Sequence, residues 1–170
     1  GNYADNLSYQ RHEITKVTDS YKLRNSKQSN ISYEANRLEY LIKNGDGAEM
    51  TLVLQVSNNN VALCYELSKK GETCSVRIMN EVTGYNFPQQ TTTFLTPQSD
   101  AMIGWKRTKP SYEEEYKADR PMNERSQFGH GYTFPCLFRV GEDGWVLLSE
   151  TGVDSRYCAS HISDYENGLY

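Results

Sequence analysis

The sequence lacks any apolar run approaching the roughly 20 residues that a membrane-spanning helix needs. It also lacks a charged segment that leads into an apolar one and a small-residue cleavage site, so no secretory leader is visible. The first residues, GNYADNLSY, are polar and contain no initiating Met, which favours a processed or engineered boundary. We therefore expect a soluble chain from which targeting information can have been removed.

Positive charge is also in short supply. Eighteen Lys and Arg face 22 Asp and Glu, the net charge is −4, and the basic residues are scattered rather than clustered. Because a phosphate backbone is bound through clustered basic side chains, this composition argues against nucleic acid as a partner.

Hydrophobic residues make up 37% of the 170 positions, enough for one domain with a single sizeable core.

Cysteine is sparse, and the four residues are Cys64, Cys74, Cys136 and Cys158. They show neither a CxxC pair nor the spacing of a zinc site or a dense disulfide framework. If residues 61–67 and 73–79 form a hairpin about Lys69, Cys64 and Cys74 face one another within disulfide reach. The alternative, which the sequence favours, is two free, half-buried thiols, because cross-strand bridges need unusual geometry.

Alternation of apolar and polar residues, the pattern of half-buried strands, runs through most of the chain. The turn sequence NGDG separates residues 37–43 from 50–56, which predicts a β-hairpin. Residues 61–67 and 76–78 extend this hairpin to a meander of about four strands. The first half of the chain is therefore expected to be antiparallel β-sheet.

Helical signal is scarce. Residues 110–119, PSYEEEYKAD, suit one short helix or helical turn, because Pro and Ser stand at its start and three glutamates in its first turn. Residues 91–131 are expected to form an irregular but ordered excursion, and the turn GEDG predicts a second hairpin between 132–140 and 145–148. The predicted fold of residues 1–170 is all-β and mainly antiparallel, a β-sandwich with at most one or two short helices.

Motifs of catalysis are absent: there is no serine-nucleophile motif, glycine-rich phosphate loop or HExxH sequence. Glu113, Glu114 and Glu115 would point in different directions on a helix and cannot converge on a cation. His130, between two glycines, has no identifiable nucleophile or acid partner. Trp105 could stack on a sugar ring, although a Trp beside Ile and Gly is more often a core anchor. No catalytic residue is assigned.

Glu150, in the segment VLLSETGVDSRY, follows a largely apolar strand. A carboxylate at the end of a rigid element can be aimed at a partner. Glu150 lacks the second carboxylate that glycoside hydrolysis needs, and calcium takes about six to eight oxygen ligands. Any catalytic or metal-binding role of Glu150 therefore requires further residues from elsewhere. The alternative is a surface charge network that includes Asp154 and Arg156, and residue chemistry alone favours it.

Three segments, GWKRTKPSYEEEY, GYTFPCLF and GWVLLSETGVDSRYC, together resemble the N-terminal domain of glycoside hydrolase family 97, α-glycosidases best represented in gut Bacteroidetes. The resemblance covers most of residues 31–170. It implies a galactose-mutarotase-like supersandwich, truncated here, that precedes a catalytic (β/α)₈ barrel and a small C-terminal β domain, both absent from this chain. A periplasmic or cell-surface location follows only from the resemblance.

The resemblance also implies a metal-binding role for Glu150. The family sandwich lends one strand-end glutamate to a calcium site beside the substrate, and Glu150 is the matching position. The other ligands and the catalytic carboxylates lie on the barrel, so this chain alone is expected neither to hold calcium nor to catalyse. Many members read EAAL after that strand, where this chain reads ETGVDSRY, and Asp154 and Arg156 carry no role from the family.

The function implied is a non-catalytic sandwich that packs on the barrel of a calcium-dependent enzyme, inverting or retaining, which hydrolyses terminal α-linked glucose or galactose in an oligosaccharide. A free-standing carbohydrate-binding module, with Trp105 and exposed tyrosines as stacking platforms, is the alternative from another class. A purely structural interaction domain is the third.

Overall fold

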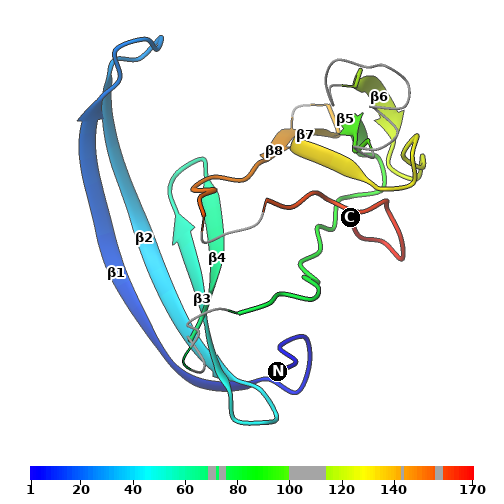
Figure 1. The fold of residues 1–170 in the computed structure, drawn as a ribbon. Coiled ribbons are helices and arrows are strands. Elements are labelled where there is room, and N and C mark those ends of the chain that lie inside the picture. The colour runs from blue at the N-terminus through cyan, green and yellow to red at the C-terminus, as the bar shows by residue number, and fades with distance from the viewer. Residues whose placement is uncertain (69–71, 73–75, 100–113, 143, 156–158) are drawn as a thin grey trace. The chain divides into compact units, whose positions relative to one another are not determined.

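The structure, a computed structural model, describes residues 1–68, 72, 76–99, 114–142, 144–155 and 159–170 (Figure 1). The chain forms two compact units, Gly1–Val82 and Thr83–Tyr170. Each unit contains one four-stranded antiparallel sheet, and every element assigned in the described residues is a strand. The predicted all-β, antiparallel fold class is confirmed, because the chain consists of the two sheets that a β-sandwich requires.

The first unit is a meander in chain order. Its strands are β1 (Ser8–Lys22), β2 (Asn30–Lys43), β3 (Glu49–Val56) and β4 (Val61–Leu67), drawn from blue to green in Figure 1. The predicted hairpin and its extension through residues 61–67 are confirmed. Strand β1 was not predicted, because its sequence SYQRHEITKVTDSYK is mostly polar and every residue but Val17 is exposed.

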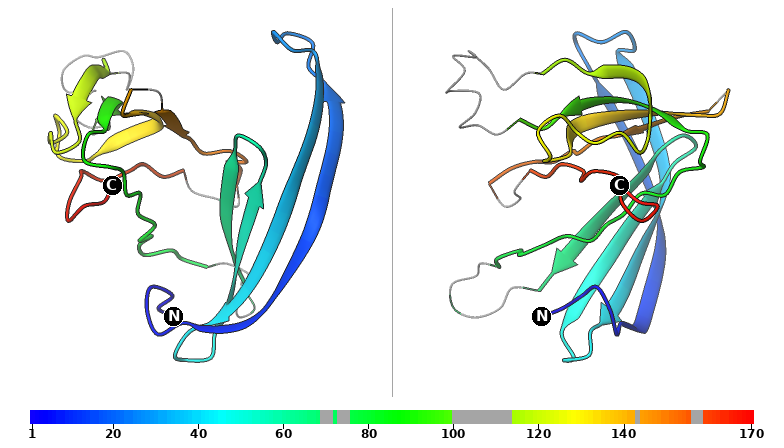
Figure 2. Two further views of the ribbon diagram at one scale, coloured as in Figure 1. Left: turned by 180° about the vertical axis from the view of Figure 1, so that it is seen from behind. Right: turned by 90° about the vertical axis from the view of Figure 1, so that its right-hand side faces the viewer.

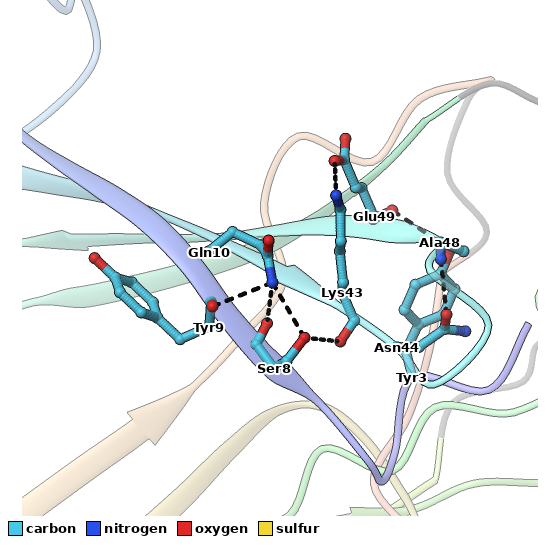
Figure 3. A network of polar contacts seen from close by, with 8 residues as sticks. All are labelled: Tyr3, Ser8, Tyr9, Gln10, Lys43, Asn44, Ala48 and Glu49. Carbon is cyan, nitrogen blue, oxygen red and sulfur yellow. Dashed lines mark hydrogen bonds and ion pairs between the residues drawn. The ribbon is translucent and has the colours of Figure 1, made fainter.

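The β2–β3 turn explains why the sequence NGDG fixes this hairpin. The Asn44 side chain accepts hydrogen bonds from the backbone amides of Asp46 and Ala48, at 3.1 and 2.8 Å, and Gly47 takes the positive φ of 76°. Beside the turn, Lys43 forms an ion pair of 3.2 Å with Glu49 (Figure 3). These contacts set the register in which residues 43 and 49 oppose one another.

The fourth predicted strand of the meander, residues 76–78, is wrong. Residues 76–80 have no regular secondary structure, and the side chains of Val76 and Ile78 are exposed. Two alternating apolar residues after a turn are too weak a signal to specify a strand.

The second sheet has the strand order β6-β5-β7-β8. Its members are β5 (Thr92–Pro97), β6 (Lys117–Pro121), β7 (Tyr132–Val140) and β8 (Gly144–Leu148). The predicted β7–β8 hairpin is confirmed, with Leu137 opposite Leu147 and Arg139 opposite Trp145.

The predicted helix at 110–119 is wrong where the structure describes it, since residues 114–116 are irregular and β6 begins at Lys117. The segment has charged residues but no apolar stripe, so a helix there would have nothing to bury. The excursion expected at 91–131 is likewise interrupted by β5 and β6. Buried and partly exposed residues alternate in β5, and Thr93, Leu95 and Pro97 are the buried ones, but this strand is too short to be recognised in advance.

The core of the second unit lies on one face of its sheet. Its buried members are Leu95, Met122, Tyr132, Cys136, Phe138, Ile162 and Tyr170. The ring of Phe138 stacks on Phe87 with 4.3 Å between centroids and meets Tyr170 edge-on. The chain's last residues are therefore part of this core, and Figure 2 shows the sheet and this C-terminal segment from two further directions.

Candidate functional site

Glu150 stands two residues beyond the end of β8. The last residue of that strand, Leu148, lies opposite Cys136, which is completely buried. Glu150 is itself half-buried. The strand that leads to this carboxylate is thus held against the centre of the core, as the sequence predicts for a side chain delivered by a rigid element.

Ser160 fixes the carboxylate of Glu150. The Ser160 backbone amide donates to Oε1 and Oε2, at 3.1 Å each, and the Ser160 hydroxyl donates to Oε1 at 2.6 Å. Hydrogen bonds to an ionised carboxylate are shorter and stronger than those between neutral groups. Both donors of one residue therefore act on one carboxylate and orient its plane.

The segment that carries Ser160 is anchored to the same strand pair. Two residues later, Ile162 exchanges backbone hydrogen bonds of 2.9 and 3.1 Å with Tyr132, the first residue of β7, and is buried. Gly131 permits this approach, because a Cβ there would stand 2.0 Å from the Ile162 carbonyl oxygen. Glu150 and Ser160 are thus positioned by two segments that are both attached to β7.

Sequence reasoning did not find Ser160. It lies ten residues after Glu150, in a segment with no alternation and no turn motif that would bring the two together. Only one feature could have pointed to Ser160, namely the buried residue Ile162 within the otherwise exposed residues 159–163. That signal is visible only once burial is known.

The surface charge network proposed for Glu150 stays a prediction. Asp154 is exposed, and Arg156 lies outside the described residues. Throughout the residues that the structure describes, no group of three or more His, Cys, Asp or Glu side chains is placed to hold a metal ion. Because calcium takes about six to eight oxygen ligands, a site that includes Glu150 needs further ligands from another part of the protein.

The other candidate residues do not form a site that the structure shows. Trp105 and Glu113 lie outside the described residues, Glu114 is half-buried and Glu115 is exposed. His130 is exposed in the loop that precedes β7. The carbohydrate-binding alternative depended first on Trp105 and therefore stays a prediction.

Cys64 and Cys74 were expected to be either two free, half-buried thiols, the favoured interpretation, or a cross-strand pair, and the structure describes only Cys64. Cys64 is an exposed free thiol on β4, whereas Cys74 lies outside the described residues. Cys136 is a buried free thiol, and burial raises its pKa to about 12.

An ion-pair cluster lies at the far edge of the second sheet. Lys117 and Arg120 contact Glu124 at 2.7 and 2.6 Å, and their hydrogen bonds hold the pKa of this carboxyl below its usual value. Beside the cluster is a cavity of about 20 Å³, lined in part by Thr93 and Tyr132. Because a ligand site normally has hundreds of Å³, this cavity accommodates a water molecule rather than a sugar.

No helix in the described part of the chain has the length and apolar character to span a bilayer. The model of the family described as "Glycosyl-hydrolase 97 N-terminal" matches residues 1–169, so the match includes β1, which the sequence resemblance did not cover. The crystal structure of a beta-arabinopyranosidase is 56% identical, with a TM-score of 0.91 over 99% of this chain and 27% of that chain. This chain therefore spans little more than a quarter of that protein's length. Comparison with curated proteins finds no match.

Proposed function

Because the chain belongs to the glycosyl-hydrolase 97 N-terminal family, we propose that it supports the catalytic domain of the same polypeptide and supplies Glu150 to a calcium site beside the substrate. In this proposal residues 1–170 are part of the N-terminal β-sandwich, and the catalytic carboxylates lie in the remaining polypeptide. A periplasmic or cell-surface location is part of the same proposal.

The observation that carries the calcium proposal is the fixed carboxylate of Glu150. An exposed glutamate without a role usually keeps its rotamer freedom, whereas Ser160 holds this one through three contacts of 3.1, 3.1 and 2.6 Å. Carboxylates that bind metals are commonly oriented by such outer hydrogen bonds. When bound, calcium would orient or polarise groups near the scissile bond.

The substrate proposed from the sequence resemblance is a terminal α-linked glucose or galactose. The similar solved protein is a beta-arabinopyranosidase, which adds a β-arabinopyranoside to the candidates. The shared region is the non-catalytic one, so we propose a pyranoside substrate and distinguish these three sugars by assay.

The test uses the full-length enzyme and its Glu150→Gln variant. Bound calcium is first removed with a chelator, and calcium binding is then measured by calorimetric titration. Hydrolysis is measured separately on aryl α-glucoside, α-galactoside and β-arabinopyranoside. Glu142→Gln is the matched control, because Glu142 is an exposed carboxylate in the β7–β8 turn. The proposal requires calcium binding to weaken in Glu150→Gln and to persist in Glu142→Gln. Equal calcium binding by Glu150→Gln and the native enzyme would contradict it.

A further inference from the structure

The second sheet has a second apolar face, opposite its core. Its members are Phe94 on β5, Leu137 on β7, and Trp145 and Leu147 on β8, and we call them the β8 patch. Phe94 lies opposite Leu137, and Leu137 lies opposite Leu147. Because directly paired residues point to the same side of a sheet, these three form one row across three strands.

The alternation of burial shows that the patch is not part of the core. Cys136 and Phe138 are completely buried, so Leu137 between them points to the other face. Leu148 and Val146 pair with these two buried residues and share their face. Trp145 and Leu147 therefore lie with Leu137 on the outward face.

Two members of the patch are strongly exposed. Trp145 is 53% exposed and Leu147 is 62% exposed. The rings of Phe94 and Trp145 meet across β7 with 5.4 Å between centroids, which makes the patch continuous. A contiguous exposed apolar patch that contains a Trp is typical of an interaction surface rather than of an ordinary solvated face.

A polar group borders the patch on the same face. Arg139, which lies opposite Trp145, binds the carboxylate of Asp119 at 2.5 Å, and Thr92 donates to the same Asp119 oxygen at 2.6 Å. An apolar centre with a polar rim is the usual composition of a protein interface. Because Arg139 is paired with Asp119 within this chain, its side chain is held in a fixed orientation at the edge of the patch.

We infer that the β8 patch docks against the catalytic domain of the same polypeptide. The chain covers only 27% of the solved glycosidase that it resembles, so most of such a protein lies beyond these residues and is available to cover the patch. Glu150 follows Leu147 by three residues, so a domain seated on β8 also comes next to this carboxylate. The inference rests on the proposed function in taking the remaining polypeptide to be the catalytic domain.

The test is photo-crosslinking in the full-length enzyme, with p-benzoylphenylalanine in place of Leu147. The same photoreactive residue in place of Tyr116 is the control, because Tyr116 is also 62% exposed and precedes β6, at the opposite edge of the sheet. Crosslinked peptides are identified by mass spectrometry. We expect the Leu147 probe to crosslink to peptides beyond residue 170 and the Tyr116 probe to give no such product.

Three outcomes would overturn the inference: a crosslink from position 147 to residues 1–82, a crosslink between two copies of the chain, and no more crosslinking than at position 116. None of these readouts depends on calcium. A crosslink to the remaining polypeptide, together with unchanged calcium binding by Glu150→Gln, would support the docking surface while the calcium part of the proposed function fails. Docking can therefore fail or succeed separately from the metal site.

Discussion

Ser160 donates hydrogen bonds from its hydroxyl and its backbone amide to the one carboxylate of Glu150. A strand end and a C-terminal segment, ten residues apart in sequence, thus converge on a single acidic group. Both are attached to β7, one through the pairing of Leu148 with Cys136 and the other through the pairing of Ile162 with Tyr132. The second unit is therefore organised so that one carboxylate is held in place at the end of β8.

If Ser160 positions Glu150, its hydroxyl should affect calcium binding. We expect Ser160→Ala to weaken calcium binding by the full-length protein roughly tenfold, which is the lower end of the range for residues that hydrogen-bond to a metal ligand. Ser160→Thr keeps a hydroxyl and should restore most of the affinity. Calorimetric titration of the two variants checks this prediction. Equal weakening by Ala and Thr would indicate that the side chain acts by packing rather than by its hydrogen bond.

Gly131 should tolerate no side chain. Its φ is +80°, and a Cβ there would stand 2.0 Å from the backbone oxygen of Ile162. Gly141 has a similar φ of +67° with nothing within 4 Å of an added Cβ, so Gly141→Ala carries only the cost of the left-handed conformation, about 1–2 kcal/mol. We expect Gly131→Ala to be clearly more destabilising, as measured by urea unfolding.

Hydrogen exchange distinguishes the cause of that destabilisation. In Gly131→Ala the amides of residues 159–163 should exchange faster, because the Tyr132–Ile162 pairing is forced apart. In Gly141→Ala these amides should keep their protection. Equal exchange and equal stability in the two variants would show that the close contact with Ile162 does not restrain the C-terminal segment.

The second unit should lose stability at alkaline pH. Burial raises the pKa of Tyr132 to about 12, above its ordinary value of 10, so the folded state retains the phenolic proton longer than the unfolded state. The stabilisation is complete below pH 10 and falls as the pH rises from 10 towards 12. Tyr132→Phe should flatten this part of the stability profile in urea unfolding measured between pH 8 and 11.5. An unchanged slope would show that Tyr132 does not titrate with folding.

The two described cysteines should differ in reactivity. Cys136 is completely buried and its pKa is raised to about 12, whereas Cys64 is exposed on β4. Since the thiolate is the nucleophile, alkylation at pH 8 should modify Cys64 and leave Cys136 unmodified until the protein unfolds. Peptide mapping by mass spectrometry separates the two sites. Modification of Cys136 in the native protein would show that the core of the second unit opens readily.

Much of the fold could be predicted from local pattern. The β2–β3 hairpin follows from apolar alternation around NGDG, and the β7–β8 hairpin from alternation around GEDG, because both signals act within a few residues. Strand β1 could not be recognised in this way, since its partner β2 specifies it rather than its own side chains. The acidic run before Lys117 suggested a helix, but the residues from Lys117 to Pro121 pair with β5 and form strand β6 instead.

The candidate site, like the fold, has a part that local sequence pattern predicts and a part that depends on tertiary contacts. The position of Glu150 beyond the end of β8 could be predicted because an apolar strand precedes it, whereas the metal-binding role that the family resemblance implies stays a prediction. Ser160 could not be predicted, because its approach depends on Gly131 and on the burial of Ile162, which are tertiary features. The patch around Trp145 and Leu147 also required the strand register, since sequence alternation alone does not say which face is covered.

Calcium titration of the full-length protein, native and Glu150→Gln, is the measurement that tests the proposed metal-binding role of Glu150. We expect saturable calcium binding by the native protein, a large loss of affinity in Glu150→Gln, and little change in Glu142→Gln. Native-like calcium binding by Glu150→Gln would contradict this role, and Glu150 would then serve only to hold the C-terminal segment through Ser160.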